Sequence, residues 1–216
     1  MTHAAALEQM IGQQVRTWDV LDPATLDAMR RVPRELFVPA AWRSLAYADC
    51  APLLAHGKRM LPPMLVGRIL LALQPQGGEQ VLEVGTGSGY LTACLGALGA
   101  QVRSLEVHDD LAARARKNLR AANVRVAEIV TADGMQLDER ERYDCVVLTA
   151  SLPLWQPRFA AALRAAGRLF AVVGTGAVME ALLVTRDARG ELQRRVLFET
   201  SLEPLEHAPA PAAFSF

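Results

Sequence analysis

The sequence has few cysteines, almost no lysine, no net charge and no long apolar run. Its 216 residues include only 3 cysteines, Cys50, Cys94 and Cys145. Their odd number and wide spacing do not indicate a disulfide framework, and no Cys/His cluster forms a zinc motif. The formal net charge of +0 at pH 7 disfavours a general attraction to nucleic acid or anionic membranes. Without a membrane-spanning run or a visible secretory signal, we expect a cytoplasmic protein without a metal site.

One stretch organises the rest of the chain. Residues 81–90 are Val-Leu-Glu-Val-Gly-Thr-Gly-Ser-Gly-Tyr, and the residues that follow have helical spacing. The apolar part predicts a buried strand of a parallel sheet. The alternating glycines permit a sharp turn with positive φ and let a ligand approach the backbone closely. Strand, glycine turn and helix form the first half of a nucleotide-binding βαβ unit. The alternative is a tight turn that binds nothing.

Two acidic residues indicate which nucleotide such a turn would bind. Glu83 stands in the strand just before the turn, where a carboxylate repels a pyrophosphate and suits an ammonium or sulfonium group. The third glycine comes one residue early for the dinucleotide fingerprint, and Tyr90 takes its place. The next predicted strand ends in Glu106, where a carboxylate accepts hydrogen bonds from both ribose hydroxyls. Together these features predict a site for S-adenosylmethionine rather than for a nicotinamide cofactor.

Strand and helix patterns alternate along the chain. We predict helices over residues 4–15, 23–31, 64–73, 90–98, 109–121 and 157–165, and strands over 81–84, 101–106, 124–131, 143–149, 167–173, 178–186 and 192–198. Asp22 and Asp109 are expected helix caps. Residues 34–39 suggest an extended link, and the long irregular stretch 42–63 is typical of a functional segment. The pattern predicts an α/β fold with a doubly wound mixed sheet and a terminal hairpin.

The length predicts a single domain with 51% hydrophobic residues for its core. We expect that domain to span residues 1–206. Within it, residues 1–75 would form an N-terminal helical, substrate-side extension and residues 76–206 the cofactor-binding core. The Ala/Pro-rich tail, 207–216, is expected to be loosely ordered.

Motifs shared with one known family occur at residues 27–39, 46–49, 81–90, 132–134 and 143–150. The most specific of them is the segment Val-Pro-Arg-Glu-Leu-Phe-Val-Pro at 32–39. On these motifs the chain resembles the protein-L-isoaspartate O-methyltransferases from about Leu7 to Leu205. The resemblance implies the seven-stranded, Rossmann-like fold of S-adenosylmethionine-dependent methyltransferases with an N-terminal helical extension. It also implies a transferase of protein repair that methylates a carboxylate of damaged aspartyl residues.

The resemblance further implies a set of cofactor-binding residues: Glu83, Gly85, Thr86, Gly87, Ser88, Gly89, Glu106, Val107, Asp133, Gly134 and Thr149. In this set Glu106 takes the ribose, Asp133 accepts from the exocyclic amine of adenine, and Thr149 ends a strand beside the methyl group. Their expected positions are carboxyl ends of strands, where open α/β sheets bind ligands. Alternatively, Asp133 closes an Asx turn and Thr149 merely ends its strand.

The segment before the helix at 64–73 departs from the family. Where members carry Gly-x-Gly-Gln-Thr-Ile-Ser-Gln-Pro, residues 55–63 are Ala-His-Gly-Lys-Arg-Met-Leu-Pro-Pro. Arg59 replaces the threonine, and Leu61 replaces the serine that supplies a hydroxyl beside the transferred methyl. Near the C-terminus, Ser-Leu-Glu-Pro-Leu at 201–205 replaces Arg-Phe-Val-Pro-Leu. We therefore place Arg59 and Leu61 at the catalytic side of the site and expect weakened isoaspartyl activity.

The expected chemistry requires no catalytic base. A carboxylate acceptor is already ionised near neutral pH, so orientation and exclusion of water are the main requirements. His56 and His108 are either bases for another nucleophile or loop residues, and Lys58 and Arg59 either bind a substrate carboxylate or are a solvated pair. Three functions stay open: methylation of isoaspartyl residues in proteins or peptides, methylation of another, small or apolar acceptor, and cofactor binding without catalysis.

Overall fold

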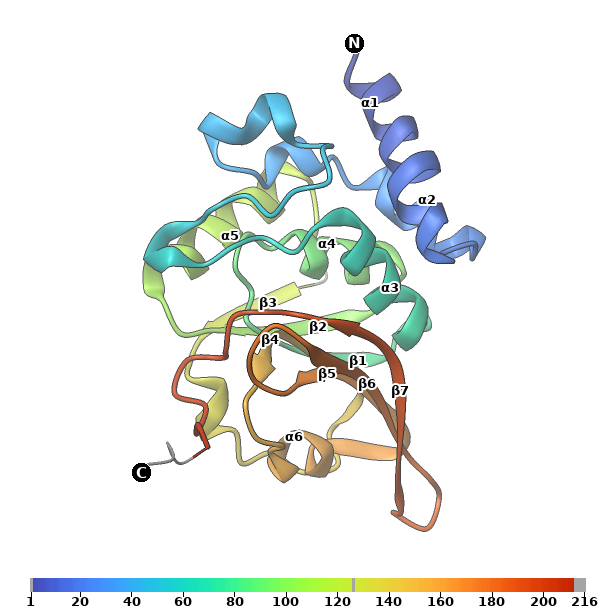
Figure 1. The fold of residues 1–216 in the computed structure, drawn as a ribbon, viewed down its shortest axis with the longest axis vertical. Helices are drawn as coiled ribbons and strands as arrows, with labels where there is room; N and C mark the ends of the chain where they lie inside the picture. The colour runs from blue at the N-terminus through green and yellow to red at the C-terminus, as the bar shows by residue number, and fades with distance from the viewer. Residues whose placement is uncertain (1, 126, 212–216) are drawn as a thin grey trace.

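The computed structural model describes residues 2–125 and 127–211. They contain one seven-stranded sheet with helices packed around it (Figure 1). The strand order is β3-β2-β1-β4-β5-β6-β7. β1 to β5 pair in parallel, whereas β6 and β7 are antiparallel to their neighbours. The strands are β1 Gln80–Val84, β2 Gln101–Glu106, β3 Ala127–Thr131, β4 Tyr143–Leu152, β5 Leu163–Val173, β6 Met179–Arg186 and β7 Leu192–Thr200. The doubly wound mixed sheet with a terminal hairpin is confirmed.

Helices cover both faces of this sheet. They are α1 His3–Met10, α2 Pro23–Arg31, α3 Pro63–Leu73, α4 Tyr90–Ala97, α5 Asp109–Ala121 and α6 Pro157–Ala161. Figure 1 shows α3, α4, α5 and the N-terminal segment on one face and α6 on the other. Each face has its own apolar core, one containing Leu70 of α3 and Leu95 of α4, the other Phe159 of α6. Within the described part of the chain, no helix has the length and apolar character that crossing a membrane requires.

The strand order reverses at β1, which lies between β2 and β4. The first crossovers place β2 and β3 on one side of β1, and the later ones place β4 and β5 on the other. Open α/β sheets bind ligands at such a reversal, in the crevice outside the carboxyl ends of the strands. Because Glu83 pairs in register with Ser104, and Val84 with Leu148, the ends of β1, β2 and β4 meet at this edge.

Local predictions differ from the structure at several element ends. The expected extended link contains a 3₁₀ turn, Arg34–Leu36, because the Phe37 N–H donates to the Arg34 carbonyl. The helix predicted over 157–165 ends at Ala161, since Leu163 already pairs with Tyr143 in the sheet. Other differences include a π-helical turn at Ile11–Val15 and His108 rather than Asp109 as the N-cap of α5. Among the strands, β3 starts at Ala127, β4 runs on to Leu152 and β5 begins at Leu163 rather than at residue 167. Of the expected loose tail, residues 212–216 lie outside the described residues.

Asp22 caps α2 as predicted, because its Oδ2 accepts a 2.8 Å hydrogen bond from the Thr25 N–H. We expect Asp22→Ala to lower the free energy of unfolding by about 1 kcal/mol, the usual cost of losing an N-cap. Urea denaturation measures this change. The matched control is Asp27→Ala on the same helix. It removes only an exposed ion pair with Arg31 and is expected to change stability by less than about 0.5 kcal/mol. Equal effects of the two substitutions would contradict the cap.

Candidate cofactor and acceptor site

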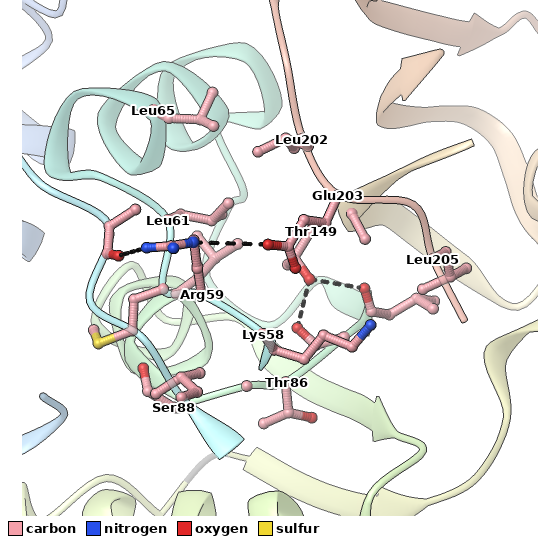
Figure 2. Close-up of a pocket in the computed structure, with 18 of the residues that line it drawn as sticks. Lys58, Arg59, Leu61, Leu65, Thr86, Ser88, Thr149, Leu202, Glu203 and Leu205 are labelled. Atoms are coloured by element: carbon pink, nitrogen blue, oxygen red, sulfur yellow. Dashed lines mark hydrogen bonds and ion pairs between the residues drawn. The ribbon is translucent and has the colours of Figure 1, made fainter. Parts of the chain in front are cut away.

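The glycine turn follows β1 directly and has the backbone that its sequence predicts. Gly85, Gly87 and Gly89 have φ of 96°, 53° and 84°. A Cβ on Gly85 would lie 2.3 Å from Thr149 Oγ1, so a larger residue is excluded by space as well as by φ. The Thr149 hydroxyl donates to the Gly85 carbonyl at 2.6 Å and to the Val84 carbonyl at 3.1 Å (Figure 2). Thr149 lies within β4, three residues before its end, and thereby fixes the start of the turn.

Glu83 is completely buried beneath the turn. Its Oε2 accepts from Ser104 Oγ at 2.6 Å and from Thr92 Oγ1. Its Oε1 is also buried and has no hydrogen-bond partner among the residues that the structure describes. Burial raises the pKa of Glu83 to about 7, although both hydroxyls lower it. A buried carboxylate with one oxygen left to accept suits a cationic ligand group.

Glu106 ends β2 and is 5% exposed. Its Oε2 accepts from the Gly87 N–H at 2.8 Å, and its Oε1 accepts from the His108 N–H at 3.2 Å. The carboxylate therefore ties the glycine turn to the chain leaving β2. A carboxylate has about four acceptor positions. Two remain, one on each oxygen, and this suits the pair of neighbouring hydroxyls of a ribose.

Asp133 and Gly134 follow β3 and approach the turn from a third strand. Asp133 Oδ1 accepts from the Met135 N–H at 2.8 Å, the Asx-type contact that the sequence offered as an alternative. Its Oδ2 lies 3.0 Å from His207 Nδ1, so the first residue of the expected loose tail has a partner in the site. A Cβ on Gly134 would lie 2.3 Å from Val84 Cγ1, which explains the glycine by close packing.

A cavity of about 560 Å³ joins these groups. The sequence-predicted residues that line it are Glu83, Gly85, Thr86, Gly87, Ser88, Glu106, Val107, Asp133, Gly134, Thr149, Arg59 and Leu61. Gly89 does not line the cavity and instead caps α4 in a left-handed conformation. In residues 2–125 and 127–211, no group of three or more His, Cys, Asp or Glu side chains is placed to hold a metal ion.

Arg34 anchors the part of the cavity wall that carries Leu61. Its side chain is completely buried, and burial lowers its pKa. Its Nε donates to the Ala46 carbonyl at 3.0 Å and its Nη2 to the Leu61 carbonyl at 2.9 Å. The guanidinium also stacks on the Tyr90 ring at 4.6 Å. The family-specific segment thus anchors the backbone of the loop that carries Leu61, independently of the Leu61 side chain.

The two cations of this loop pair with the C-terminal segment across the cavity. Lys58 Nζ lies 2.6 Å from Glu206 Oε1. Arg59 Nε lies 3.7 Å from Glu203 Oε1, and Figure 2 shows this second pair. Lys58 and Arg59 are therefore not simply a solvated pair. His56 stacks on His108 with ring centroids 3.9 Å apart, and its Nε2 forms a 2.8 Å hydrogen bond with Asp110 Oδ1. These contacts favour the loop-residue interpretation of His56.

The sequence did not indicate several residues of the cavity wall. Trp18 and Phe198 line it from opposite ends of the chain, with ring centroids 6.2 Å apart. Met179 of β6 lines it as well. None of these residues belongs to a local motif, so only the fold brings them together. Arg34 lay in a recognisable segment, but nothing in that segment predicted its contact with Leu61.

The fold and the cavity define a Rossmann-like methyltransferase: a seven-stranded sheet with β7 antiparallel beside β6, a glycine turn after β1, and acids at the ends of β1 and β2. Comparison with known proteins gives the family. The profile of the protein-L-isoaspartate(D-aspartate) O-methyltransferase family matches residues 5–208. The protein belongs to this family, as its motifs predicted.

Curated relatives agree over nearly the whole chain. A protein-L-isoaspartate O-methyltransferase of Koribacter versatilis is 37% identical over 91% of this chain and 89% of its own length. One from Xanthomonas campestris pv. campestris (strain B100) is 36% identical over 95% of this chain and 91% of its own. Among solved structures, a Plasmodium falciparum chain described as such an enzyme, in complex with S-adenosyl-L-homocysteine, has a TM-score of 0.80. It is 19% identical and covers 95% of this chain and 99% of its own, which confirms the fold.

Proposed function

We propose that the protein is an S-adenosylmethionine-dependent O-methyltransferase that esterifies the free carboxylate of isoaspartyl residues in peptides and proteins. Membership of the family supports the reaction. The observation that carries the cofactor is the pair of buried acids in one cavity. Glu83 keeps one buried oxygen without a donor, and Glu106 keeps one acceptor position on each oxygen beside the glycine turn.

We assign the residues to roles by their chemistry. Glu83 and the turn from Gly85 to Ser88 hold the charged methionine part, Glu106 and Val107 hold the ribose, and Asp133 with Gly134 borders the adenine. When bound, S-adenosylmethionine supplies an electrophilic methyl group on a sulfonium. Residues before 75 supply one part of the acceptor side, with Trp18, Arg59 and Leu61. Residues after 75 supply the cofactor side and, through Phe198 and Glu203, the rest of the acceptor side. The chain's task is to hold the acceptor carboxylate in line and keep water out.

A methyl-transfer assay with labelled cofactor tests this function. One peptide is prepared with an isoaspartyl residue and, as its matched control, with a normal aspartyl residue at the same position. We expect label on the isoaspartyl peptide, in a form that base releases as methanol, and none on the control. Absence of label from the isoaspartyl peptide, for protein that binds the cofactor, would refute the proposed acceptor.

A second acceptor class is favoured by the apolar wall of the cavity. Trp18, Phe198 and Met179 surround its acceptor side, and Leu61 adds further apolar surface. Such a wall suits an acceptor that has an apolar group beside its nucleophile. An acceptor screen that labels small apolar carboxylic acids but not isoaspartyl peptides would favour this function over the first.

The raised pKa of Glu83 predicts a pH dependence of cofactor binding. The carboxyl is protonated below about pH 7 and ionised above it. A cationic ligand requires the ionised form, so binding releases a proton, and affinity falls as pH drops. Between pH 8 and pH 6 we expect the affinity for S-adenosylmethionine to fall about tenfold, since each pH unit below the pKa removes tenfold of the ionised form.

Calorimetry in two buffers of different ionisation enthalpy measures both the affinity and the released proton. The control is Glu83→Gln, which keeps the size of the side chain but does not titrate. We expect weak binding in this variant with no dependence on pH. A wild-type affinity that stays flat from pH 8 to pH 6 would refute the role of Glu83.

A further inference from the structure

Two substrate-side departures from the family pattern face each other in the structure. Arg59 stands where the family has threonine, and Glu203 stands where it has valine in the C-terminal segment. Arg59 Nε lies 3.7 Å from Glu203 Oε1, and Arg59 Nη1 donates to the Ala51 carbonyl at 3.3 Å. Figure 2 shows Arg59 pointing toward Glu203. The two replacements therefore form one ion pair.

This pair lies in the wall of the cavity that holds the proposed cofactor and acceptor residues. Arg59, Leu61, Thr149 and Glu203 all line the same cavity. The backbone of Glu203 is fixed, because its carbonyl accepts from the Ser151 N–H at 2.9 Å. Its side chain is 48% exposed, and that of Arg59 is 53% exposed. Both side chains can therefore change partners while the segment stays in place.

We propose that Glu203 is an internal carboxylate that occupies Arg59 until the carboxylate of the acceptor displaces it. The Arg59–Glu203 pair is then a specificity determinant: it admits acceptors that bring a negative charge to Arg59. The inference rests on the proposed function for the identity of the acceptor. It gives the cavity a cationic group for the acceptor carboxylate at the place where Leu61 offers no hydroxyl.

The Arg59–Glu203 ion pair is weak enough for an acceptor carboxylate to displace Glu203. An exposed ion pair is worth about 0.2–1 kcal/mol, so competition by Glu203 weakens acceptor binding by no more than about fivefold. The exchange conserves charge at Arg59, because one carboxylate replaces another. The neighbouring pair is different. Lys58 and Glu206 are 2.6 Å apart, and their side chains are only 28% and 37% exposed. Glu206 lines the same cavity on the same segment, and its replacement removes one negative charge without freeing Arg59, so it is the control for a general charge effect.

The test measures binding rather than turnover. An isoaspartyl peptide is titrated by calorimetry into protein saturated with S-adenosylhomocysteine. We expect Glu203→Gln to lower the Kd of the peptide about two- to fivefold. Arg59→Gln is expected to raise it, and in the Arg59→Gln background the Glu203→Gln change is expected to have no further effect. Glu206→Gln should leave the Kd within about twofold of the wild type, which corresponds to about 0.4 kcal/mol.

A second ligand separates exchange from a general charge effect. The same peptide with its isoaspartyl carboxylate converted to an amide should bind wild type and Glu203→Gln equally. An unchanged or higher Kd in Glu203→Gln overturns the inference. So does an equal gain in Glu206→Gln, a gain that persists without Arg59, or no detectable binding to any variant. Methyl transfer is assayed separately. If wild-type protein binds the peptide without methylating it, the proposed function is refuted. The Kd ratios then still decide whether Glu203 competes with the acceptor carboxylate for Arg59.

Discussion

Glu106→Ala is expected to weaken the binding of S-adenosylmethionine about a hundredfold. The ribose would lose hydrogen bonds to a charged acceptor, which are worth roughly 1.5–3 kcal/mol. The structure adds a second loss, because the same carboxylate accepts from the Gly87 and His108 N–H groups and fixes the turn. A combined loss of roughly 3 kcal/mol corresponds to about a hundredfold in Kd. Calorimetry with the cofactor and with its demethylated product measures the change.

A conservative variant separates the two losses. Glu106→Gln keeps the length of the side chain and one accepting oxygen, but its amide nitrogen must face one of the two backbone donors. We expect an intermediate affinity. Urea denaturation of both variants checks that the turn remains folded, since a partly unfolded protein would also bind less. If folded Glu106→Ala bound the cofactor within about threefold of wild type, a difference below 1 kcal/mol, the assignment of Glu106 to the ribose would be refuted.

The cofactor side of the site could be predicted because its residues are tied to local patterns. The glycine turn follows a buried strand, Glu106 ends the next one, and Asp133 follows a third. Parallel strands joined by helices place their carboxyl ends at one edge. A correct strand pattern therefore brings these residues together without further information. Gly89 is the exception: it caps α4 and does not line the cavity, because the turn continues directly into the helix.

Apart from Arg59 and Leu61, the residues of the proposed acceptor side could not be predicted, because they meet only through the fold. The pairing of Ser151 with Pro204 carries the C-terminal segment across the cavity, and nothing near either residue indicates it. Arginines are seldom fully buried, so the burial of Arg34 against the Leu61 loop has no signal in composition or spacing. The predicted end of the helix over 157–165 was wrong for a related reason. Leu163 joins the sheet by pairing with Tyr143, and this pairing overrides the local helical pattern.

Leu61→Ser is expected to raise the rate of isoaspartyl methylation roughly ten- to hundredfold. An acceptor carboxylate that is desolvated beside Leu61 finds no hydroxyl donor there, and an unsatisfied polar group costs about 1–3 kcal/mol, more when it is charged. At 1.36 kcal/mol per factor of ten, restoring the donor recovers one or two orders of magnitude. Pro62 and Pro63 supply no backbone N–H in the same loop. In the proposed exchange Arg59 supplies a charged donor to the acceptor carboxylate, and a hydroxyl at position 61 would add a second donor.

The structure makes this substitution a clean test. The loop is anchored through the Leu61 carbonyl, which accepts from Arg34 Nη2 at 2.9 Å, so the backbone keeps its position when the side chain changes. Leu61→Ala is the matched control, since it removes the same bulk without adding a donor, and we expect little gain in kcat from it. Adding Arg59→Thr to Leu61→Ser should keep the gain in kcat and raise KM. A fall in kcat on introducing the serine, with cofactor affinity unchanged, would show that Leu61 belongs to a working pocket for another acceptor.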